Sequence, residues 1–382
     1  MQRAIFNENR WSRFACLGLC LVVVGGACKA MPVADDWPMF RGNPQSTGVA
    51  AGALPEQLDV LWKFELPQGS FESTPAIVDG IVYLTEFSGK LIAIDLATGQ
   101  KRWEIATDLG FSASPLVHQG HIYVGDVAGE FYCFDTQGAK KWQFTATGEI
   151  NSSANYFQDK VLVGSQDATL YCLNAQTGAE VWRMNANDQI QCSPTIVEER
   201  CFIAGCDGNL HVVDLKNGQE LGTVPMSQTL ATPVVSGDAV YCGTEQAGFF
   251  AVDWRNLKSL WHLDVDGPIH SSPTIALGRG AGQTDLVIFG AQNRTLYACA
   301  ADSGKSAWQF TARGKIDASP VIAGERVFVA DSSGRLYAVQ VADGKLQQEI
   351  ELGGGFTGSP AIADGRLVIA SKRGVVYCLG SK

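Results

Sequence analysis

A Ser/Thr-Pro pair recurs about every forty residues along this 382-residue chain. The pairs are spaced by 39 or 40 residues, except for one spacing of 47 that indicates an insertion around Leu277–Asp285. Eight copies of one unit therefore cover the chain from Asp59 onward, which is the signature of a repeat architecture. Seven places are Ser/Thr-Pro pairs, and Ser153-Ala154 fills the third place with alanine instead of proline. The eight places are Thr74-Pro75, Ser114-Pro115, Ser153-Ala154, Ser193-Pro194, Thr232-Pro233, Ser272-Pro273, Ser319-Pro320 and Ser359-Pro360.

Each copy has the pattern of four short β-strands. In the first copy, Ser73–Val78 and Ile81–Phe87 are apolar segments separated by a tight Asp79-Gly80 turn. Leu91–Asp95 and Arg102–Ile105 follow after further glycine-containing turns. Repeats of about forty residues with four strands each are typical of propeller blades. The sequence thus predicts an all-β fold, an eight-bladed β-propeller of four-stranded antiparallel blades.

The two ends of the repeat region predict how the ring closes. The eighth copy stops at Val375–Leu379 without a fourth strand, whereas Val60–Phe64 precedes the first copy. This early segment resembles the fourth strands Lys141–Phe144 and Leu260–Leu263. We expect it to complete blade eight, so that the propeller spans residues 59–382 and leaves no open sheet edge between its ends.

The first thirty residues read as an export signal. Three arginines precede the apolar run Phe14–Ala27, which is too short to span a bilayer comfortably. Residues 1–30 are therefore interpreted as a signal peptide, which predicts a periplasmic, outer-membrane-associated or secreted protein. Cys28 follows small residues, as at a lipoprotein processing site, and is a candidate for lipidation. Ordinary cleavage near Ala27, Ala30 or Ala34 is the alternative.

The charge balance argues against one class of partner. Asp and Glu outnumber Lys and Arg by 39 to 29, which gives a net charge of −10. An acidic protein of this kind repels phosphate backbones, so nucleic-acid binding is not expected. Downstream of the signal, no apolar stretch is long enough to form a transmembrane span. Membrane contact is expected only through a lipid on Cys28.

A second motif ends most of the copies with a tryptophan. Ala93–Trp103, Cys133–Trp142 and Cys172–Trp182 are close variants, whereas Gly222 and Gln348 stand in the tryptophan position of blades four and seven. This motif resembles the tryptophan-docking repeat of pyrroloquinoline-quinone-type (PQQ-type) propellers. Its physical role is packing, because a large indole can cover the gap to the next blade. The structural tryptophans are Trp62, Trp103, Trp142, Trp182, Trp261 and Trp308.

The resemblance covers about 320 residues and separates two groups of propellers. Quinoprotein dehydrogenases of the family are longer and share a disulfide between adjacent cysteines, a calcium site and a catalytic Asp. This chain has no adjacent cysteines. It looks more like the exported propellers of the family of outer-membrane assembly factor BamB. Within the leader, residues 31–58, the stretch Asp36–Gly42 resembles one found in such proteins and is expected to strap across one face; a disordered tether is the alternative.

No catalytic or metal-binding motif is present. The five histidines lack ligand-like spacing with Cys, Asp or Glu, and no nucleophile elbow or phosphate loop occurs. Cysteines such as Cys133, Cys201 and Cys242 occupy apolar strand positions and read as small buried hydrophobes. A disulfide framework is not expected, although a pairing of Cys192 with Cys206 stays open.

The candidate ligand site is a ring at one channel mouth. If the Ser/Thr-Pro strand is innermost, the residues three places before each proline position surround the channel. They are chemically varied, whereas the Ser/Thr position is uniform and suits architecture. A solvated mouth without a ligand is the alternative, and the three calcium-type side chains Glu72, Asn151 and Asp317 are spread around the ring. The ring consists of Glu72, Ser112, Asn151, Gln191, Leu230, His270, Asp317 and Thr357.

Taken together, the sequence predicts an exported, non-catalytic and monomeric propeller that acts as a protein–protein interaction scaffold at the cell envelope. The resemblance implies outer-membrane protein assembly and partners in that machinery. No cofactor is expected. One alternative is a PQQ-dependent oxidoreductase that uses the channel mouth with calcium. Another is a carbohydrate- or polymer-binding module.

Overall fold

The computed structural model describes residues 35–280, 282 and 284–382. The predicted signal peptide and the candidate lipidation site Cys28 lie outside the described residues. Within the described ranges, no helix has the length and apolar character needed to cross a bilayer.

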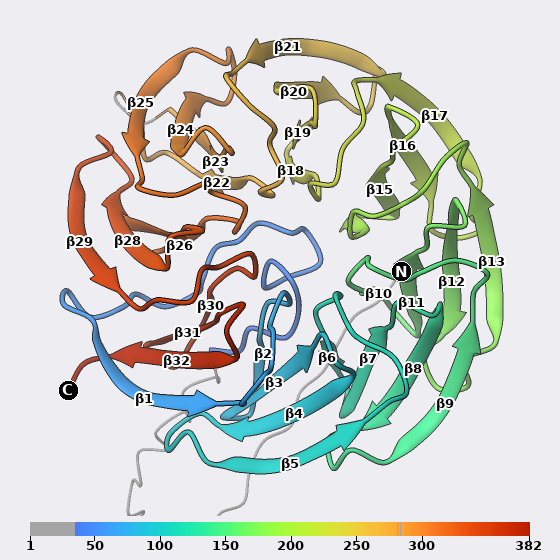
Figure 1. Ribbon diagram of the computed structural model, residues 1–382. Helices are drawn as coiled ribbons and strands as arrows, with labels where there is room; N and C mark the ends of the chain where they lie inside the picture. The colour runs from blue at the N-terminus through green and yellow to red at the C-terminus, as the bar shows by residue number, and fades with distance from the viewer. Residues whose placement is uncertain (1–34, 281, 283) are drawn as a thin grey trace, which may run out of the picture. The chain divides into compact units, whose positions relative to one another are not determined.

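The described residues form eight four-stranded antiparallel sheets arranged as blades of a propeller (Figure 1). The predicted fold class is therefore confirmed. In every blade the strands run in sequence order from the channel outward, except in the blade that closes the ring. The short inner strands line the channel, and the fourth strands lie at the rim (Figure 1).

The inner strands all have three residues. They are β2 (Ala76–Val78), β6 (Leu116–His118), β10 (Asn155–Phe157), β14 (Thr195–Val197), β18 (Val234–Ser236), β22 (Thr274–Ala276), β26 (Val321–Ala323) and β30 (Ala361–Ala363). The second strands are mostly buried. They are β3 (Ile81–Glu86), β7 (His121–Gly125), β11 (Lys160–Gly164), β15 (Arg200–Ala204), β19 (Ala239–Gly243), β23 (Leu286–Gly290), β27 (Arg326–Ala330) and β31 (Arg366–Ala370).

The third strands are buried as well. They are β4 (Lys90–Asp95), β8 (Glu130–Asp135), β12 (Thr169–Asn174), β16 (Asn209–Asp214), β20 (Gly248–Asp253), β24 (Thr295–Ala300), β28 (Arg335–Gln340) and β32 (Val375–Gly380). The rim strands are more exposed. They are β5 (Lys101–Ala106), β9 (Lys140–Thr145), β13 (Glu180–Asn185), β17 (Glu220–Pro225), β21 (Lys258–Asp264), β25 (Ser306–Thr311), β29 (Leu346–Glu351) and β1 (Asp59–Glu65).

Blade eight is built from strands at both ends of the propeller. Strand β1 pairs antiparallel with β32, from Asp59 opposite Gly380 to Glu65 opposite Val375. In Figure 1 the blue β1 lies beside the red β32. The predicted closure by an N-terminal strand is confirmed, and it leaves this blade without an unpaired third strand.

A closed ring of hydrogen bonds joins the blades around the channel. At each Ser/Thr position, the backbone N–H donates to the hydroxyl oxygen of the Ser or Thr at the same position in the next blade. Ser359 N–H closes the ring by donating to Thr74 Oγ1 at 3.0 Å. The other seven donor–acceptor pairs are Thr74–Ser114, Ser114–Ser153, Ser153–Ser193, Ser193–Thr232, Thr232–Ser272, Ser272–Ser319 and Ser319–Ser359.

The rim tryptophans join each blade to the next one. Trp62 Nε1 donates to the carbonyl oxygen of Leu96 in blade one at 2.9 Å. Its ring packs on Gly99, where a Cβ atom would come within 2.6 Å of the indole and where φ is +73°. Only glycine suits this turn, because it tolerates both the close approach and the positive φ. The same bond is made by Trp103, Trp142, Trp182, Trp261 and Trp308.

The two blades that lack this tryptophan face a leucine instead of a glycine. Gly222 of blade four faces Leu257, and a Cβ atom on Gly222 would lie 2.2 Å from Leu257 Cδ1. Gln348 of blade seven faces Leu58, and its amide exchanges two hydrogen bonds with the Leu58 backbone, at 2.9 and 3.0 Å. Each missing indole is thus replaced by a complementary contact.

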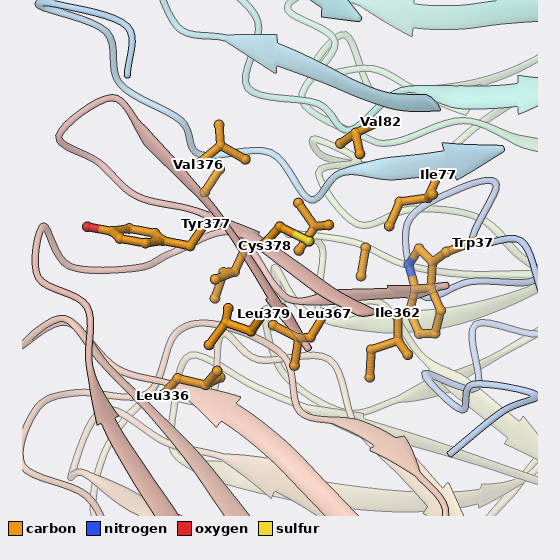
Figure 2. Close-up of a cluster of buried hydrophobic side chains, with 14 of the residues drawn as sticks. Trp37, Ile77, Val82, Leu336, Ile362, Leu367, Val376, Tyr377, Cys378 and Leu379 are labelled. Carbon is orange, nitrogen blue, oxygen red and sulfur yellow. The ribbon is translucent and has the colours of Figure 1, made fainter. Parts of the chain in front are cut away.

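The leader crosses one end of the ring as a strap. Trp37 exchanges two backbone hydrogen bonds with Ile77 of β2, and Pro38 accepts one from Val117 of β6. Figure 2 shows Trp37 packed beside Ile77 and Ile362, within a buried cluster that also contains β32 side chains. The strap also places a buried Arg41, which donates to Pro273 O at 2.9 Å. Burial lowers the pKa of this guanidinium to about 9.

The hydroxyl ring predicts a specific stability defect. Ser193→Ala removes the acceptor of the buried Ser153 N–H and should lower the free energy of unfolding by about 1–3 kcal/mol, the cost of an unsatisfied buried donor. The measurement is urea denaturation. Ser193→Thr keeps a hydroxyl, as Thr74 and Thr232 do naturally, and should stay closer to the wild type. Equal stabilities for the Ala and Thr variants would contradict the role of the ring.

Candidate functional site

The eight candidate ring residues line one cavity of about 170 Å³ in the channel. They stand above the Ser/Thr ring, and Phe40 of the strap also lines the cavity. Each comes from a different blade, in the segment that leads from a rim strand into the next inner strand. The fold thus gathers residues that are 39 to 47 positions apart in the sequence. Whether they bind a ligand stays a prediction.

Several ring residues are bound to one another or to residues beside the ring. Ser112 Oγ donates to Asn151 Oδ1 at 2.6 Å, and Glu72 Oε1 lies 3.4 Å from Lys372 Nζ. Gln191 Nε2 donates to Gln189 Oε1 at 2.9 Å. These contacts hold one side of the mouth as a polar but mostly neutralised surface.

A charged cluster lies at the mouth of blades five to seven. His270 Nε2 is 2.7 Å from Glu245 Oε1, and its Nδ1 is 3.3 Å from Asp317 Oδ1. The contact with Glu245 is a close ion contact, because its angle is not that of a hydrogen bond. Gln292 Nε2 donates to Asp317 Oδ1 at 2.9 Å and lies 2.9 Å from His270 Nδ1. The cluster combines a cation, two carboxylates and an amide.

These contacts shift two pKa values in opposite directions. The hydrogen bond to Asp317 raises the pKa of His270 above its ordinary value of 6.5, with Glu245 adding to the effect against the opposing effect of burial. Burial raises the pKa of Asp317, but the hydrogen bonds from His270 and Gln292 outweigh it, so the net shift is below 3.8. The pair is therefore charged in the pH range between these ordinary values.

Sequence reasoning found His270 and Asp317 but missed Glu245 and Gln292. Both occupy the turn between the second and third strands of their blade, and their backbone N–H groups donate to Gln228 O and Pro268 O. These bonds dock the turn beside the mouth. The same bond recurs in every blade at intervals of 39, 40 or 47 residues, and this periodicity was the signal in the sequence that could have located these turns. The turn residues are Phe87, Val127, Gln166, Cys206, Glu245, Gln292, Ser332 and Lys372.

A larger groove lies beside the mouth, between blades one and two. Its volume is about 550 Å³, and its lining includes Asp108, Leu109, Glu130, Tyr132 and Lys140. Leu109 is 48% exposed, and nearby Phe87 is 51% exposed. The groove therefore combines apolar contact area with mostly negative charge.

The other histidines and the cysteines of the described residues lie outside the ring at the mouth or are buried in the blades. His211 lies between Asp207 and Glu220, at 3.0 and 2.5 Å, and His118 stacks on Tyr156. Across the part of the chain that the structure describes, no group of three or more His, Cys, Asp or Glu is arranged to hold a metal ion. The eight described cysteines are free, so the alternative Cys192–Cys206 pairing is not formed.

Comparison with known proteins identifies the repeat region. A family model described as outer membrane protein assembly factor BamB matches residues 53–156, 134–268 and 206–382. These overlapping matches together cover well over half of the chain. The tryptophan-ended repeats that carried the resemblance in the sequence lie within them, whereas Asp36–Gly42 lies outside.

Curated relatives match over shorter segments. BamB of Nitrosomonas eutropha is 29% identical over 119 residues, which are 31% of this chain and 29% of that protein. The quinohemoprotein alcohol dehydrogenase of Comamonas testosteroni is 28% identical over 215 residues, which are 44% of this chain and 30% of that protein. The matches thus span less than a third of the length of these relatives.

Solved structures show the same fold. BamB from Moraxella catarrhalis has a TM-score of 0.72 at 18% identity, over 85% of this chain and 100% of that chain. The Comamonas testosteroni dehydrogenase has a TM-score of 0.77 at 15% identity, over 91% of this chain and 81% of that one. At such identities the likeness concerns the fold alone.

The His270 cluster predicts a pH-dependent stability. Because the folded pKa of His270 is raised, its ion contacts stabilise the protein fully below pH 6.5 and are lost as the pH rises through the raised pKa. The lowered pKa of Asp317 keeps its own contribution present above pH 3.8. The melting temperature of the wild type should therefore fall more steeply than that of His270→Gln as the pH rises from 6 to 8. His121→Gln is the control, since the His121 ring contacts the Gln119 carbonyl and Tyr123 and makes no ion pair within the described ranges. Identical slopes for His270→Gln and wild type would refute this assignment.

Proposed function

Because this chain belongs to the family of outer membrane protein assembly factor BamB, we propose that it is an exported scaffold without catalytic residues. In this role it binds proteins of the cell envelope and serves outer membrane protein assembly. Family membership over residues 53–382 is the observation that carries the proposal. The predicted signal peptide supports a periplasmic location, with membrane contact through Cys28 if that residue is lipidated.

The mouth end of the propeller offers the surface for such binding. Phe87 and Leu109 are about half exposed there, beside the 550 Å³ groove. Exposed aromatic and aliphatic side chains surrounded by polar groups are typical anchors of protein interfaces. The hydroxyl ring and the docked tryptophans hold these loops in fixed positions, which limits the entropy lost on binding.

The channel lining does not fit pyrroloquinoline quinone. This quinone carries three carboxylates, whereas the cavity presents the carboxylates of Glu72 and Asp317 and includes no Lys or Arg in its lining. The one basic residue of the lining, His270, already contacts Glu245 and Asp317. The carboxylates of the quinone and those of Glu72 and Asp317 would repel one another strongly in a partly buried site. The cavity volume of about 170 Å³ is also small for a fused three-ring ligand. We therefore propose a scaffold rather than a quinoprotein.

The assembly role predicts a defined phenotype. Deleting the gene in the organism that encodes this chain should reduce the amount of folded β-barrel protein in the outer membrane, measured by heat-modifiable mobility on gels. The intact gene should restore it. Leu109→Asp should fail to do so, because it places a charge on the exposed apolar surface at the mouth. Leu260→Asp, at a rim residue that is 52% exposed, is the matched control and should restore it. An unchanged outer membrane after deletion would overturn the assembly role.

The absence of a quinone cofactor is tested separately. Calorimetric titration of the chain from Asp35 onward with pyrroloquinoline quinone, with and without calcium, should give flat heats because the lining includes no Lys or Arg to bind the carboxylates of the quinone. Saturable, calcium-dependent binding that is lost in Asp317→Ala would favour the oxidoreductase alternative instead.

A further inference from the structure

The strap end of the channel has its own apolar groove, distinct from the mouth. Its volume is about 330 Å³, and it lies between the strap and the inner strands of blades five to seven. Thr47 and Val49 of the strap form one wall, and Val235, Ile275 and Ile322 contribute to the other. At the rim, Val49 is 37% exposed and Leu277 is 64% exposed.

The strap itself shows how this end of the channel binds an extended chain. The middle residue of an inner strand turns its N–H and C=O toward the channel, because its neighbours make the bonds to the second strand. Ile77 uses both groups to pair with Trp37, and Ile322 pairs with Gly48 and Ala50. Val117 and Ile196 each donate one N–H to the strap.

In blades five and six the middle residue of the inner strand presents the same N–H and C=O groups, but the strap does not pair with them. Val235 is paired opposite Val240, and Ile275 opposite Val287, in the register that Ile77 has opposite Val82. Within the described ranges, neither Val235 nor Ile275 receives a backbone bond from the strap. The strap passes from blade four to blade six in one step, because Thr195 Oγ1 donates to Ser46 and Thr274 Oγ1 donates to Thr47 O.

We propose that this groove binds an extended apolar peptide segment of another protein by adding it as a short β-strand beside Val235 and Ile275. The site continues the seat of the strap, since Val49 both pairs with Ile322 and forms a groove wall. Backbone pairing gives affinity in such strand addition, and pockets for alternate side chains give selectivity. The site lies at the opposite end of the inner strands from the mouth, so it is independent of the proposed function.

The size and lining of the groove define the peptide. A cavity of about 150 Å³ lined by aliphatic side chains is enough to bind benzene. A groove of 330 Å³ therefore has room for about two branched aliphatic side chains. Side chains two positions apart face the same side of a strand. The expected ligand is an extended segment with Val, Ile or Leu at positions i and i+2.

The test uses a fluorescein-labelled peptide, Lys-Thr-Val-Thr-Val-Thr-Lys, titrated with the chain from Asp35 onward and followed by anisotropy. Saturable binding is expected, with a Kd of about 0.1 mM or lower. A peptide with Asp in place of both valines should not bind. A peptide with N-methylated backbone at the central residues should also lose binding, because it keeps the side chains but cannot pair as a strand.

Protein variants locate the site. Val49→Lys and Leu277→Lys each change an exposed rim residue and should weaken binding at least about ten-fold. Leu346→Lys, at a rim-strand residue that is 44% exposed, is the matched control and should bind as the wild type does. Unchanged melting temperatures establish that the variants fold. The proposal is overturned if the valine peptide does not bind, if the Asp or N-methylated peptide binds equally well, or if both groove variants bind like the control.

Discussion

The ring of eight hydroxyls is the constraint on which the rest of the molecule depends. Each Ser or Thr at this position both donates its backbone N–H to the next blade and accepts from the preceding one. Ala at this position could still donate its N–H but would have no hydroxyl oxygen to accept a bond. In seven of the eight blades the next residue is a proline, which has no N–H that would need a partner. This explains why the position is uniform while the mouth residues two places earlier vary freely.

The rim is organised by a second pairing rule, which holds even where the repeat fails. A tryptophan in one blade requires a glycine in the next, because the indole occupies the space of the missing Cβ atom. Where the second residue is Leu257 or Leu58, the tryptophan is replaced by Gly222 or Gln348. The Leu58 exception falls where the strap enters blade eight. The residue at the tryptophan position of one blade and the residue at the glycine position of the next blade therefore change together, which keeps the contacts between blades complementary.

The sequence predicted most of the fold because both rings leave periodic marks in it. The Ser/Thr-Pro spacing, the rim tryptophans and the strand that closes blade eight could all be identified from residues that recur along the sequence. Glu245 and Gln292 escaped notice because they come from turns, whose contact with the mouth depends on how the blade curves. The seat of the strap escaped for a similar reason: Asn155, Thr195 and Thr274 bind it through side chains at positions that are apolar in other blades.

The two ends of the channel consequently differ in chemistry, and this difference bears on function. At the mouth, eight varied side chains face a shallow cavity that reaches only to Phe40. At the other end the strap is held by backbone pairs, and it carries Arg41, a buried cation with a single protein acceptor. Burying such a charge costs several kcal/mol, so the strap contacts must outweigh that cost. A channel blocked in this way is poorly suited to passing a substrate through, and this favours binding on the two end surfaces.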